Sequence, residues 1–346
     1  MGIKQASKTR YLYEIHDNFT FKQTDYYATF EDTEFDEGSF RYAYKGEIKN
    51  MAGIPTKPDL FPNEKCVVKI FKDKKYGIND FIIDLNNYYY SRKVSSIFNS
   101  KYKELSYIRK FNYIPTYVTS LGKYSTYKLF YLFPIKNSNQ MKKIKEDQWI
   151  TIEPLLDGKF EKFIQNNCIE EYNTDETIAL FMHWNWVYSK GKALICDIQG
   201  EEKYNSFELT DPAVQSINNE YGKSDLGLCS LINFLIYHNH NELCKDLPWP
   251  NEDKMKKLYQ IGYQMEYIQY TGDYSLCKNY KNLYKEIIDS TFIKKSNEFN
   301  NYNNNFSNFI NIVTIFILFI LFFFYRTYIK KRKSKKLENE YELYEI

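Results

Sequence analysis

The sequence predicts an α+β protein built of two lobes with a cleft between them. Two observations lead to this prediction: the first half of the chain is rich in strand patterns, and the second half mixes strands with helices. The chain has 346 residues, which is enough to bury a large core. One long apolar segment near its end is different in kind and adds a predicted membrane helix.

The first half is dominated by strand patterns. Short alternating stretches separated by turn residues run from about residue 26 to residue 70. A longer segment then has apolar residues at helical intervals, with Asn79 or Asp80 as its expected N-cap. The expected elements are strands at 66–71, 127–135 and 148–156 and a helix at 78–99.

The second half alternates helices with a buried strand. The segment TDETIALFMHWNWVYS (174–189) predicts a helix, and KALICDIQG (192–200) predicts a buried strand that runs into a loop. Helical spacing returns in LGLCSLINFLIYHNHNELC (226–244). Residues 251–295 continue with helical spacing and mixed charge, so we expect them to dock on the domain or to lead towards the apolar segment.

The apolar segment reads FINIVTIFILFILFFFY (309–325) and carries no charge. At about 1.5 Å per residue, this run and its flanks can span a hydrocarbon core of roughly 30 Å. A buried core helix is the alternative, but such helices seldom lack a polar face altogether. We therefore expect a transmembrane helix at 309–328, with the lipid bilayer as a partner.

Composition indicates the compartment and the partners. The 6 cysteines are scattered without the spacing of a disulfide framework, and no apolar signal region begins the chain. Both facts favour a reducing compartment, with thiols or metal ligands rather than disulfides. The net charge is +3, no long basic stripe interrupts residues 1–300, and we expect no nucleic-acid partner.

Histidines and a cysteine cluster in HNHNELC (238–244), which holds two of the 4 histidines. If the helix continues through this segment, His240 and Cys244 share a face, and His238 can turn towards them. Zinc prefers four nitrogen or sulfur ligands, and His183, in an apolar helical stretch, is the candidate fourth ligand. Surface histidines and a core histidine bonded to backbone would give the same pattern, so spacing alone leaves both open.

Acidic and amide side chains follow the buried strand. Asp197 and Gln199 of CDIQG are two apart, so both side chains point the same way in an extended segment. Asp211 of TDP adds a second carboxylate, and such oxygen ligands suit Mg²⁺. An ordinary strand-to-turn junction with solvated acids has the same pattern, so these residues alone do not decide.

Basic residues and glycines offer candidate phosphate contacts. Lys69 lies in an otherwise apolar strand, where it reaches solvent or faces an anion. Gly38 and Arg41, in DEGSFRYAYKG, begin a strand pair where backbone and guanidinium could approach phosphates. The segment YGKSDLG (221–227) resembles a glycine loop that opens a helix, a docking point for an anion or a peptide.

The order of these pieces resembles the atypical alpha-kinases, which include myosin heavy chain kinase, elongation factor 2 kinase and the channel-kinases. The resemblance covers roughly residues 25–250. Family spacings are kept: His183 lies 14 residues before Asp197, Gly222 lies 16 before His238, and Cys244 lies six after His238. The resemblance implies a two-lobed protein-kinase-like fold with a structural zinc site in the second lobe. It also implies an ATP-dependent serine/threonine protein kinase.

The resemblance implies a role for each site residue. Lys69 looks like the strand lysine that contacts ATP phosphate, and Arg41 like the phosphate-side arginine of the first lobe. Glu153 is similar to the hinge residue beside the adenine, and Asp197 resembles the acid that orients the accepting hydroxyl and can take its proton. The implied metal ligands are Gln199 and Asp211 for Mg²⁺ and His183, His238, His240 and Cys244 for Zn²⁺.

The chain departs from the family at three places. His240 stands where the family usually has cysteine, so the zinc site would be formally +1 rather than neutral. Ser224, Asp225 and Ser230 alter the glycine loop and are expected to place a charge and extra side chains where peptide substrate lies. The segment between the two acids is four residues longer than usual and is expected to bulge outward. The altered glycine loop and the longer segment motivate the alternative, a pseudokinase scaffold or nucleotide-binding module at a membrane, while an active membrane-anchored kinase is the leading hypothesis.

ATP chemistry and reduced thiols favour a cytosolic kinase domain. Basic residues after the apolar segment favour the opposite orientation by the positive-inside rule. We expect the cytosolic orientation, because moving so large a domain without a signal is the rarer event. The expected domains are a polar N-terminal segment (1–24), the alpha-kinase domain (25–250), a helical extension (251–295), a polar linker (296–308), the transmembrane helix (309–328) and a basic then acidic tail (329–346).

Overall fold

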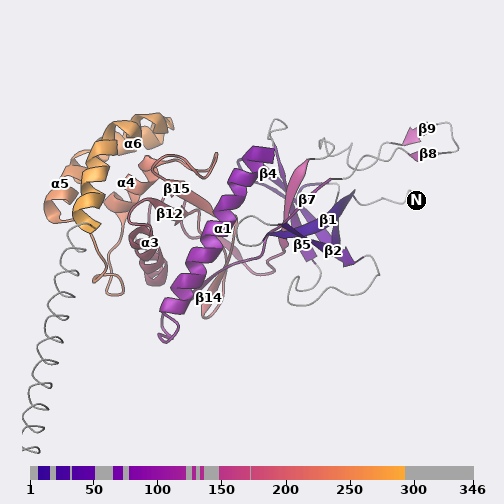
Figure 1. Ribbon diagram of the computed structural model, residues 1–346, viewed down its shortest axis with the longest axis horizontal. Helices are drawn as coiled ribbons and strands as arrows, with labels where there is room; N and C mark the ends of the chain where they lie inside the picture. Colours follow the sequence, from indigo (N-terminus) through magenta and orange to yellow (C-terminus); the bar gives the residue numbers. More distant parts are fainter. Residues whose placement is uncertain are drawn as a thin grey trace, which may run out of the picture. The chain divides into compact units, whose positions relative to one another are not determined.

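The structure is a computed structural model that describes residues 7–15, 21–31, 33–50, 65–72, 78–121, 127–129, 133–135, 148–171 and 173–292. The chain divides into two compact units, Met1–Lys285 and Glu286–Ile346. The first unit holds both lobes, the cavity between them and the histidine–cysteine cluster (Figure 1). It mixes sheets and helices, so the predicted α+β class is confirmed.

The first lobe is a seven-stranded sheet in the order β2-β1-β7-β10-β5-β4-β3. Strand β2 also pairs with β4, so six of these strands form a closed ring around an apolar core that includes Leu12, Phe30, Val68 and Ile152. Position 46 accepts only glycine, because an added Cβ would lie 2.6 Å from the carbonyl oxygen of Thr29. The strands are β1 (Ser7–Ile15), β2 (Phe21–Phe30), β3 (Asp36–Glu37), β4 (Arg41–Asn50), β5 (Lys65–Phe71), β7 (Tyr117–Ser120) and β10 (Trp149–Pro154).

Helix α1 (Ile78–Lys101) links the two lobes and lies between them in Figure 1. Its first turns bury Phe81 and Leu85 against the sheet. Near its other end, Phe98 packs edge-on against Phe111 and Phe181 of the second lobe. Each such buried side chain contributes roughly 1.5–3 kcal/mol, so one helix holds both lobes together.

The second lobe contains a four-stranded sheet, β11-β13-β14-β6, and a separate pair, β12–β15. Helix α3 begins where the Asp175 side chain accepts from the backbone N–H groups of Thr177 and Ile178. The strands of this lobe are β6 (Lys110–Tyr113), β11 (Phe160–Lys162), β12 (Ala193–Cys196), β13 (Gln199–Glu202), β14 (Ser206–Thr210) and β15 (Ala213–Ser216). Strands β8 (Tyr127–Leu129) and β9 (Phe133–Ile135) pair antiparallel in a separate two-stranded sheet outside this lobe. The helices are α3 (Glu176–Tyr188), α4 (Leu228–Tyr237), α5 (Glu252–Gln260), α6 (Gly262–Thr271) and η3 (Tyr274–Tyr280), and residues 281–292 are also helical.

The strands predicted at 66–71 and 148–156 and the helices at 78–99 and 174–189 are confirmed, with ends shifted by a few residues. Strand β1 lies in a stretch where apolar and polar residues do not alternate regularly, so the sequence did not predict it. Its pairing with β2 contains register shifts between Lys8 and Tyr11 and again between Tyr11 and Tyr13. Such bulges interrupt the alternation on which strand prediction depends.

The helix predicted over 226–244 is wrong in its second half. Helix α4 ends at Tyr237, and His238 has extended backbone angles, φ −66° and ψ 125°. His240 therefore lies in an irregular segment and Cys244 in a turn, and the two do not share a helix face. Asn239 and Asn241 favour turns over helix interiors, which explains the early end.

The expectation of free thiols throughout is also wrong. Two disulfides join Cys168 to Cys196 and Cys229 to Cys277, and among the described cysteines Cys66 and Cys244 are free. The paired cysteines are 28 and 48 residues apart, and only the fold brings them together. The second bridge ties η3 to α4, so the part of the chain from residue 251 to η3 is linked covalently to the second lobe.

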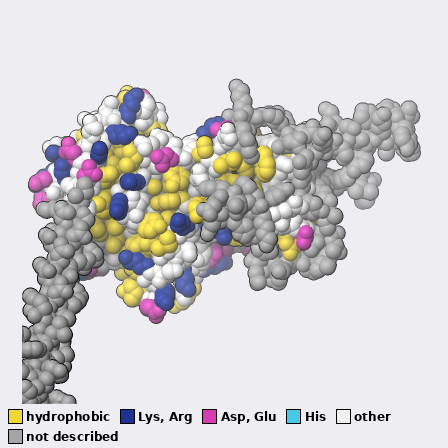
Figure 2. Space-filling view, viewed as in Figure 1, with side chains coloured by type: hydrophobic (Ala, Val, Ile, Leu, Met, Phe, Trp, Pro, Cys, Tyr) yellow, Lys and Arg dark blue, Asp and Glu magenta, His cyan; other side chains and the backbone are white. Residues whose placement is uncertain are grey.

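Helix α5 carries acidic and basic residues, whereas α6 carries one charged residue, Glu266. Figure 2 shows basic and acidic side chains scattered over this part of the molecule, with hydrophobic side chains between them. The described helices include none that is both long enough and apolar enough to cross a membrane. The predicted span, 309–328, lies outside the described residues, as do the linker and the tail beside it.

Candidate active site

A cavity of about 480 Å³ lies between the lobes and is lined by all six residues expected to handle the nucleotide. The first lobe contributes Arg41 from β4, Lys69 from β5 and Glu153 from β10. The second lobe contributes three residues at the ends of β12, β13 and β14. These are Asp197, Gln199 and Asp211.

Lys69 is buried and points into this cavity. Its Nζ lies 2.7 Å from Oε2 of Glu153, 3.0 Å from Oγ1 of Thr210 and 3.4 Å from Oδ1 of Asp211. Burial alone would lower the pKa of Lys69, but Asp211 and Glu153 raise it above its usual value. The lysine is therefore fully charged at neutral pH and does not reach solvent.

Arg41 joins α1 to the second lobe. Its Nη1 lies 2.7 Å from Oδ1 of Asp211 and donates to the hydroxyl of Tyr88 at 2.7 Å, while Nη2 pairs with Asp84. Burial opposes the charge of Arg41, but Asp84, Tyr88 and Asp211 raise its pKa well above the usual value. Sequence reasoning missed Asp84 and Tyr88. The available signal was an acid and a tyrosine four apart on the face of α1 that also carries buried Phe81.

The two acids expected at the site share an unusual backbone. Asp197 and Asp211 have φ angles of 52° and 51°, in the left-handed region that few residues other than glycine adopt. Burial would raise the pKa of Asp211, but Lys69, Arg41 and a hydrogen bond from Tyr88 hold it well below the usual value. Strained residues of this kind concentrate at functional sites.

Asp197 has a cationic partner that the sequence did not indicate. Nζ of Lys162 lies 2.5 Å from Oδ1 of Asp197, and Nε2 of Gln199 donates to Oδ2 at 3.2 Å. Strand β11 pairs with β13 so that Lys162 lies opposite Gln199. Burial raises the pKa of Asp197, and Lys162 opposes that rise. No local pattern marked Lys162, because its role depends on the pairing of two separate strands.

The longer segment between Asp197 and Asp211 forms a regular hairpin instead of an outward bulge. Strands β13 and β14 pair from Gln199↔Thr210 to Glu202↔Phe207. An even number of added residues divides equally between two paired strands, so the register next to the cavity is kept. Asp211 therefore reaches the site without distortion of the hairpin.

The altered glycine loop is also built differently from expectation. The carboxylate of Asp225 is buried and accepts hydrogen bonds from the N–H and hydroxyl of Ser216 and from the N–H groups of Tyr221 and Gly227. Ser230 is fully buried in α4. Neither side chain lines the cavity, and Asp225 instead holds the loop together. Of the three altered residues, Ser224 alone lines the cavity.

Glu153 lies at the cavity, but its side chain has a different partner from the one expected. Oε2 accepts from Lys69 and from the hydroxyl of Thr210, and Oε1 accepts from Thr116 at 3.2 Å. The carboxylate thus holds the lysine in place. The segment after it, Pro154 to Leu156, lines the cavity wall.

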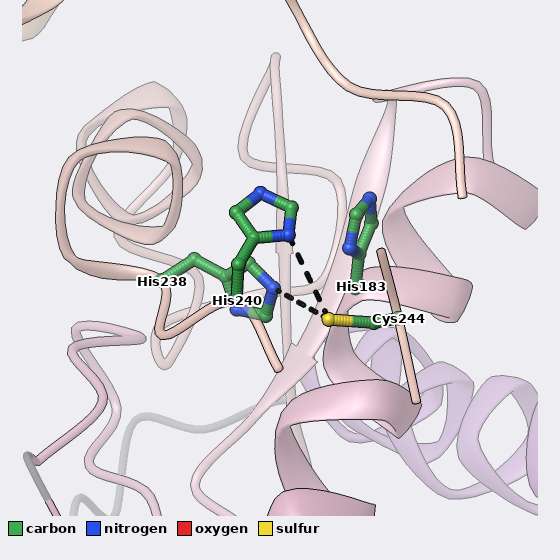
Figure 3. A group of neighbouring side chains, drawn as sticks. All are labelled: His183, His238, His240 and Cys244. Carbon is green, nitrogen blue, oxygen red and sulfur yellow. Dashed lines mark hydrogen bonds between the residues drawn. The ribbon is translucent and has the colours of Figure 1, made fainter. Parts of the chain in front are cut away.

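The four predicted zinc ligands form a second cluster in this lobe. Ligand atoms of His183, His238, His240 and Cys244 all lie within 4.8 Å of one another. Figure 3 shows the rings gathered around the cysteine sulfur, which lies 3.6 Å from Nε2 of His238 and 3.7 Å from Nδ1 of His240. Helix α3 supplies the first residue, and the segment after α4 supplies the other three.

The cluster fits a tetrahedral zinc ion. Zinc bonds of about 2.0–2.1 Å to nitrogen and 2.3 Å to sulfur place these atoms roughly 3.6 Å apart at tetrahedral angles. Nε2 of His183 lies 3.0 Å from the carbonyl oxygen of Pro248, which leaves Nδ1 buried with no hydrogen-bond partner. Burial lowers the pKa of His183 and His238 to about 3 and of His240 to about 4, so all three are neutral donors at pH 7.

A buried carboxyl group lies behind this cluster. Oε1 of Glu170 is 2.6 Å from Nδ1 of His238, and Oε2 accepts from the N–H of Asn239 at 3.0 Å. Burial raises the pKa of Glu170 to about 8. Sequence reasoning did not single out Glu170, because nothing in the local pattern places it beside a histidine so far along the chain.

Comparisons with known proteins agree with this geometry. The model of the Alpha-kinase family matches residues 36–244. Alpha-protein kinase vwkA of Dictyostelium discoideum is 32% identical over 118 residues, which are 33% of this chain and 19% of that protein. Human transient receptor potential cation channel subfamily M member 6 is 36% identical over 114 residues, 30% of this chain and 5% of that protein. The chain thus spans a fifth or less of the length of these two relatives.

Solved structures are similar over most of the described fold. An alpha kinase from Entamoeba histolytica matches with a TM-score of 0.54 and 25% identity, over 72% of this chain and 94% of that one. The alpha-kinase domain of myosin heavy chain kinase A in complex with ADP matches with a TM-score of 0.51 and 19% identity, over 70% of this chain and 96% of that one. The latter likeness concerns the fold alone.

Proposed function

Since the chain belongs to the alpha-kinase family, we propose that it is a protein kinase that transfers the γ-phosphate of ATP to a serine or threonine hydroxyl of a protein substrate. The observation that carries this proposal is the convergence of Arg41, Lys69, Asp197, Gln199 and Asp211 in one cavity. Phosphoryl transfer requires positioning and neutralised charge more than covalent chemistry from the protein. The ADP complex of a structurally similar kinase domain supports the same assignment.

Arg41 and Lys69 would bind the phosphate oxygens. Both cations now pair with Oδ1 of Asp211, and both line the cavity. A planar guanidinium and an ammonium in a site of low dielectric stabilise the charge that spreads over the transferred group. Glu153 and Asp84 hold these two side chains in position.

Asp197 would accept a hydrogen bond from the substrate hydroxyl and take its proton. The hydroxyl oxygen then forms a bond to the γ-phosphorus, the bond from that phosphorus to the bridging oxygen breaks, and ADP leaves. Lys162 favours the ionised form of Asp197, which this step requires.

Gln199 and Asp211 would hold Mg²⁺. Their side-chain oxygens are the ligand type that the ion prefers, and the depressed pKa of Asp211 keeps its carboxylate ionised at neutral pH. Mg²⁺, when bound, would neutralise phosphate charge. Nε2 of Gln199 donates towards Asp197 and towards the carbonyl oxygen of Asp211, which leaves its own Oε1 for a metal.

His183, His238, His240 and Cys244 would hold a structural Zn²⁺ ion. The ion would fix α3 to the segment that follows α4, and so would stabilise the fold. Metal analysis of the purified chain should find one zinc ion per molecule, and a chelator should lower the melting temperature. His183→Ala should abolish both effects, and a metal-free wild-type chain would contradict this part of the proposal.

Residues 309–328 would hold the chain in a membrane, with the lobes in the cytosol. The uncharged run from residue 309 to residue 325 supports the anchor, and the use of ATP supports the cytosolic side. The disulfides remove the support that reduced cysteines would have given. Deletion of 309–328 should release the chain from the membrane fraction, whereas deletion of the linker 296–308 should not; retention in both cases would reject the anchor.

The kinase proposal is tested by transfer of labelled γ-phosphate from ATP to a serine/threonine peptide library with Mg²⁺. The wild-type chain should transfer phosphate, and Asp197→Ala should lower the rate by at least about a hundredfold. Stabilisation by nucleotide without any transfer would favour a pseudokinase module instead. Equal transfer by wild type and Asp197→Ala would reject the assignment.

A further inference from the structure

The acidic side chain of Glu170 contacts the histidine–cysteine cluster through His238. Its side chain is fully buried beside His238, which is also fully buried. In the described part of the chain, no lysine or arginine forms an ion pair with Glu170. A buried carboxylate without a cation is costly, so its position calls for a positive charge close by.

The metal site would supply that charge. Three neutral imidazoles and one thiolate around a dication leave a net charge of +1. Two thiolates would cancel the 2+ charge of zinc. Here the neutral His240 takes the place of a second thiolate, so one positive charge remains. An ionised Glu170 would cancel this remaining charge, although it contacts the ligand His238 and not the metal itself.

We propose that Glu170 is the charge-balancing and positioning residue of a zinc site formed by His183, His238, His240 and Cys244. The inference rests on the zinc site of the proposed function and deepens it. Glu170 does not bind the ion; it acts through His238 and through the charge of the site.

The geometry also assigns Glu170 a positioning role. Its Oε1 lies 2.6 Å from Nδ1 of His238, and Nε2 of that ring lies 3.6 Å from the sulfur of Cys244. With zinc bound, an ionised Glu170 would accept the Nδ1–H and leave Nε2 for the metal. Its Oε2 accepts the N–H of Asn239, which fixes the backbone between the two neighbouring histidines. Carboxylates that orient a ligating histidine in this way increase its basicity and the affinity for metal.

A double-mutant cycle on the full-length chain separates charge from hydrogen bonding. The proteins are wild type, Glu170→Gln, His240→Cys and the double variant, with Glu171→Gln as the matched control because that neighbouring acid is exposed. The zinc dissociation constant is measured by competition with a chromophoric chelator. Glu170→Gln should weaken zinc binding by about tenfold or more, and Glu171→Gln should leave it unchanged. In the His240→Cys background, the second thiolate balances the charge, so Glu170→Gln should weaken binding by less than about threefold.

Melting temperatures with excess chelator guard against misfolded variants. Glu170→Gln without metal should melt no lower than wild type, because the substitution removes a buried acid that has no cationic partner. Equal weakening of zinc binding in both backgrounds would show that Glu170 is only a hydrogen-bond acceptor, and no weakening in either would show that it has no role; both overturn the inference. A wild-type chain that binds no zinc would overturn the metal site as well, whereas phosphate transfer is measured independently.

Discussion

Nζ of Lys162 lies 2.5 Å from Oδ1 of Asp197. Lys162 is on β11, opposite Gln199 of β13, and Asp197 lies two residues before Gln199. Burial raises the pKa of Asp197, and this lysine is the largest influence in the opposite direction. The protonation of the candidate catalytic base therefore depends on a residue of β11 that the sequence pattern did not indicate.

Lys162→Met should move the acidic limb of the pH–rate profile to higher pH. The base works when ionised, and loss of the ammonium group raises the pKa of Asp197 further above its usual value. The measurement is kcat/KM for phosphate transfer between pH 5 and 9. Lys159→Met, which removes an exposed lysine from the same segment, is the control and should leave the limb in place. An unchanged limb in Lys162→Met would mean that Lys162 does not control the base.

Lys69→Met should lower both stability and activity, and Glu153→Gln should restore only stability. The single variant leaves the buried Glu153 carboxylate without its cation, at a cost of about 3 kcal/mol or more. The double variant removes that charge, so its free energy of unfolding in urea should recover most of the loss. Phosphate transfer should stay lower by at least about a hundredfold in both variants, because the phosphate contact is absent. Recovered activity in the double variant would contradict the role assigned to Lys69.

Asp225→Ala should destabilise the protein by about 2 kcal/mol or more. Asp225 accepts from four donors of the loop, and its loss leaves buried N–H groups without partners. Asp225→Asn keeps one acceptor oxygen and should cost less. Glu220→Ala, an exposed change in the same loop, should lie within about 0.5 kcal/mol of wild type. Chemical unfolding of the four proteins makes the comparison, and a neutral Asp225→Ala would show that the loop does not depend on this carboxylate.

Thiol counting tests the disulfides. Unfolded, unreduced protein should react with a thiol reagent at Cys66 and Cys244 only, because the other four cysteines are paired. Prior reduction should raise the number to all 6 cysteines. Cys277→Ser should lower the stability by about 2–5 kcal/mol in non-reducing buffer and leave it nearly unchanged in reducing buffer. Six reactive thiols without reductant would contradict both bridges.

The sequence predicted local elements and the cleft residues better than it predicted contacts. The strand of Lys69 is a nearly continuous apolar run, and the helix at 78–99 is long and begins after a plausible cap. Asp197 and Asp211 directly follow strands, Gln199 begins one, and all three line one cavity. Strand β1 escaped prediction because bulges disturb its alternation. The predicted end of α4 was too late because His240 and Cys244, at helical spacing, outweighed the two turn-forming asparagines Asn239 and Asn241.

The partners of the site residues could not be read from the sequence. Lys162, Asp84 and Glu170 each act on a residue far along the chain, and each contact depends on how separate elements pack. The cysteine pairs are a further case, since four cysteines allow several pairings and only the fold selects one. Local spacing identifies which side chains can do chemistry, and tertiary packing decides which groups they meet.

The hairpin between the two acids has a practical consequence. Its turn carries Tyr204, which is 93% exposed, while its base keeps Gln199 opposite Thr210. A fluorophore or epitope grafted at this tip would lie at the far end of a paired ladder from the chemistry. The protein could thus be tracked in cells through a reporter that leaves the cavity residues undisturbed.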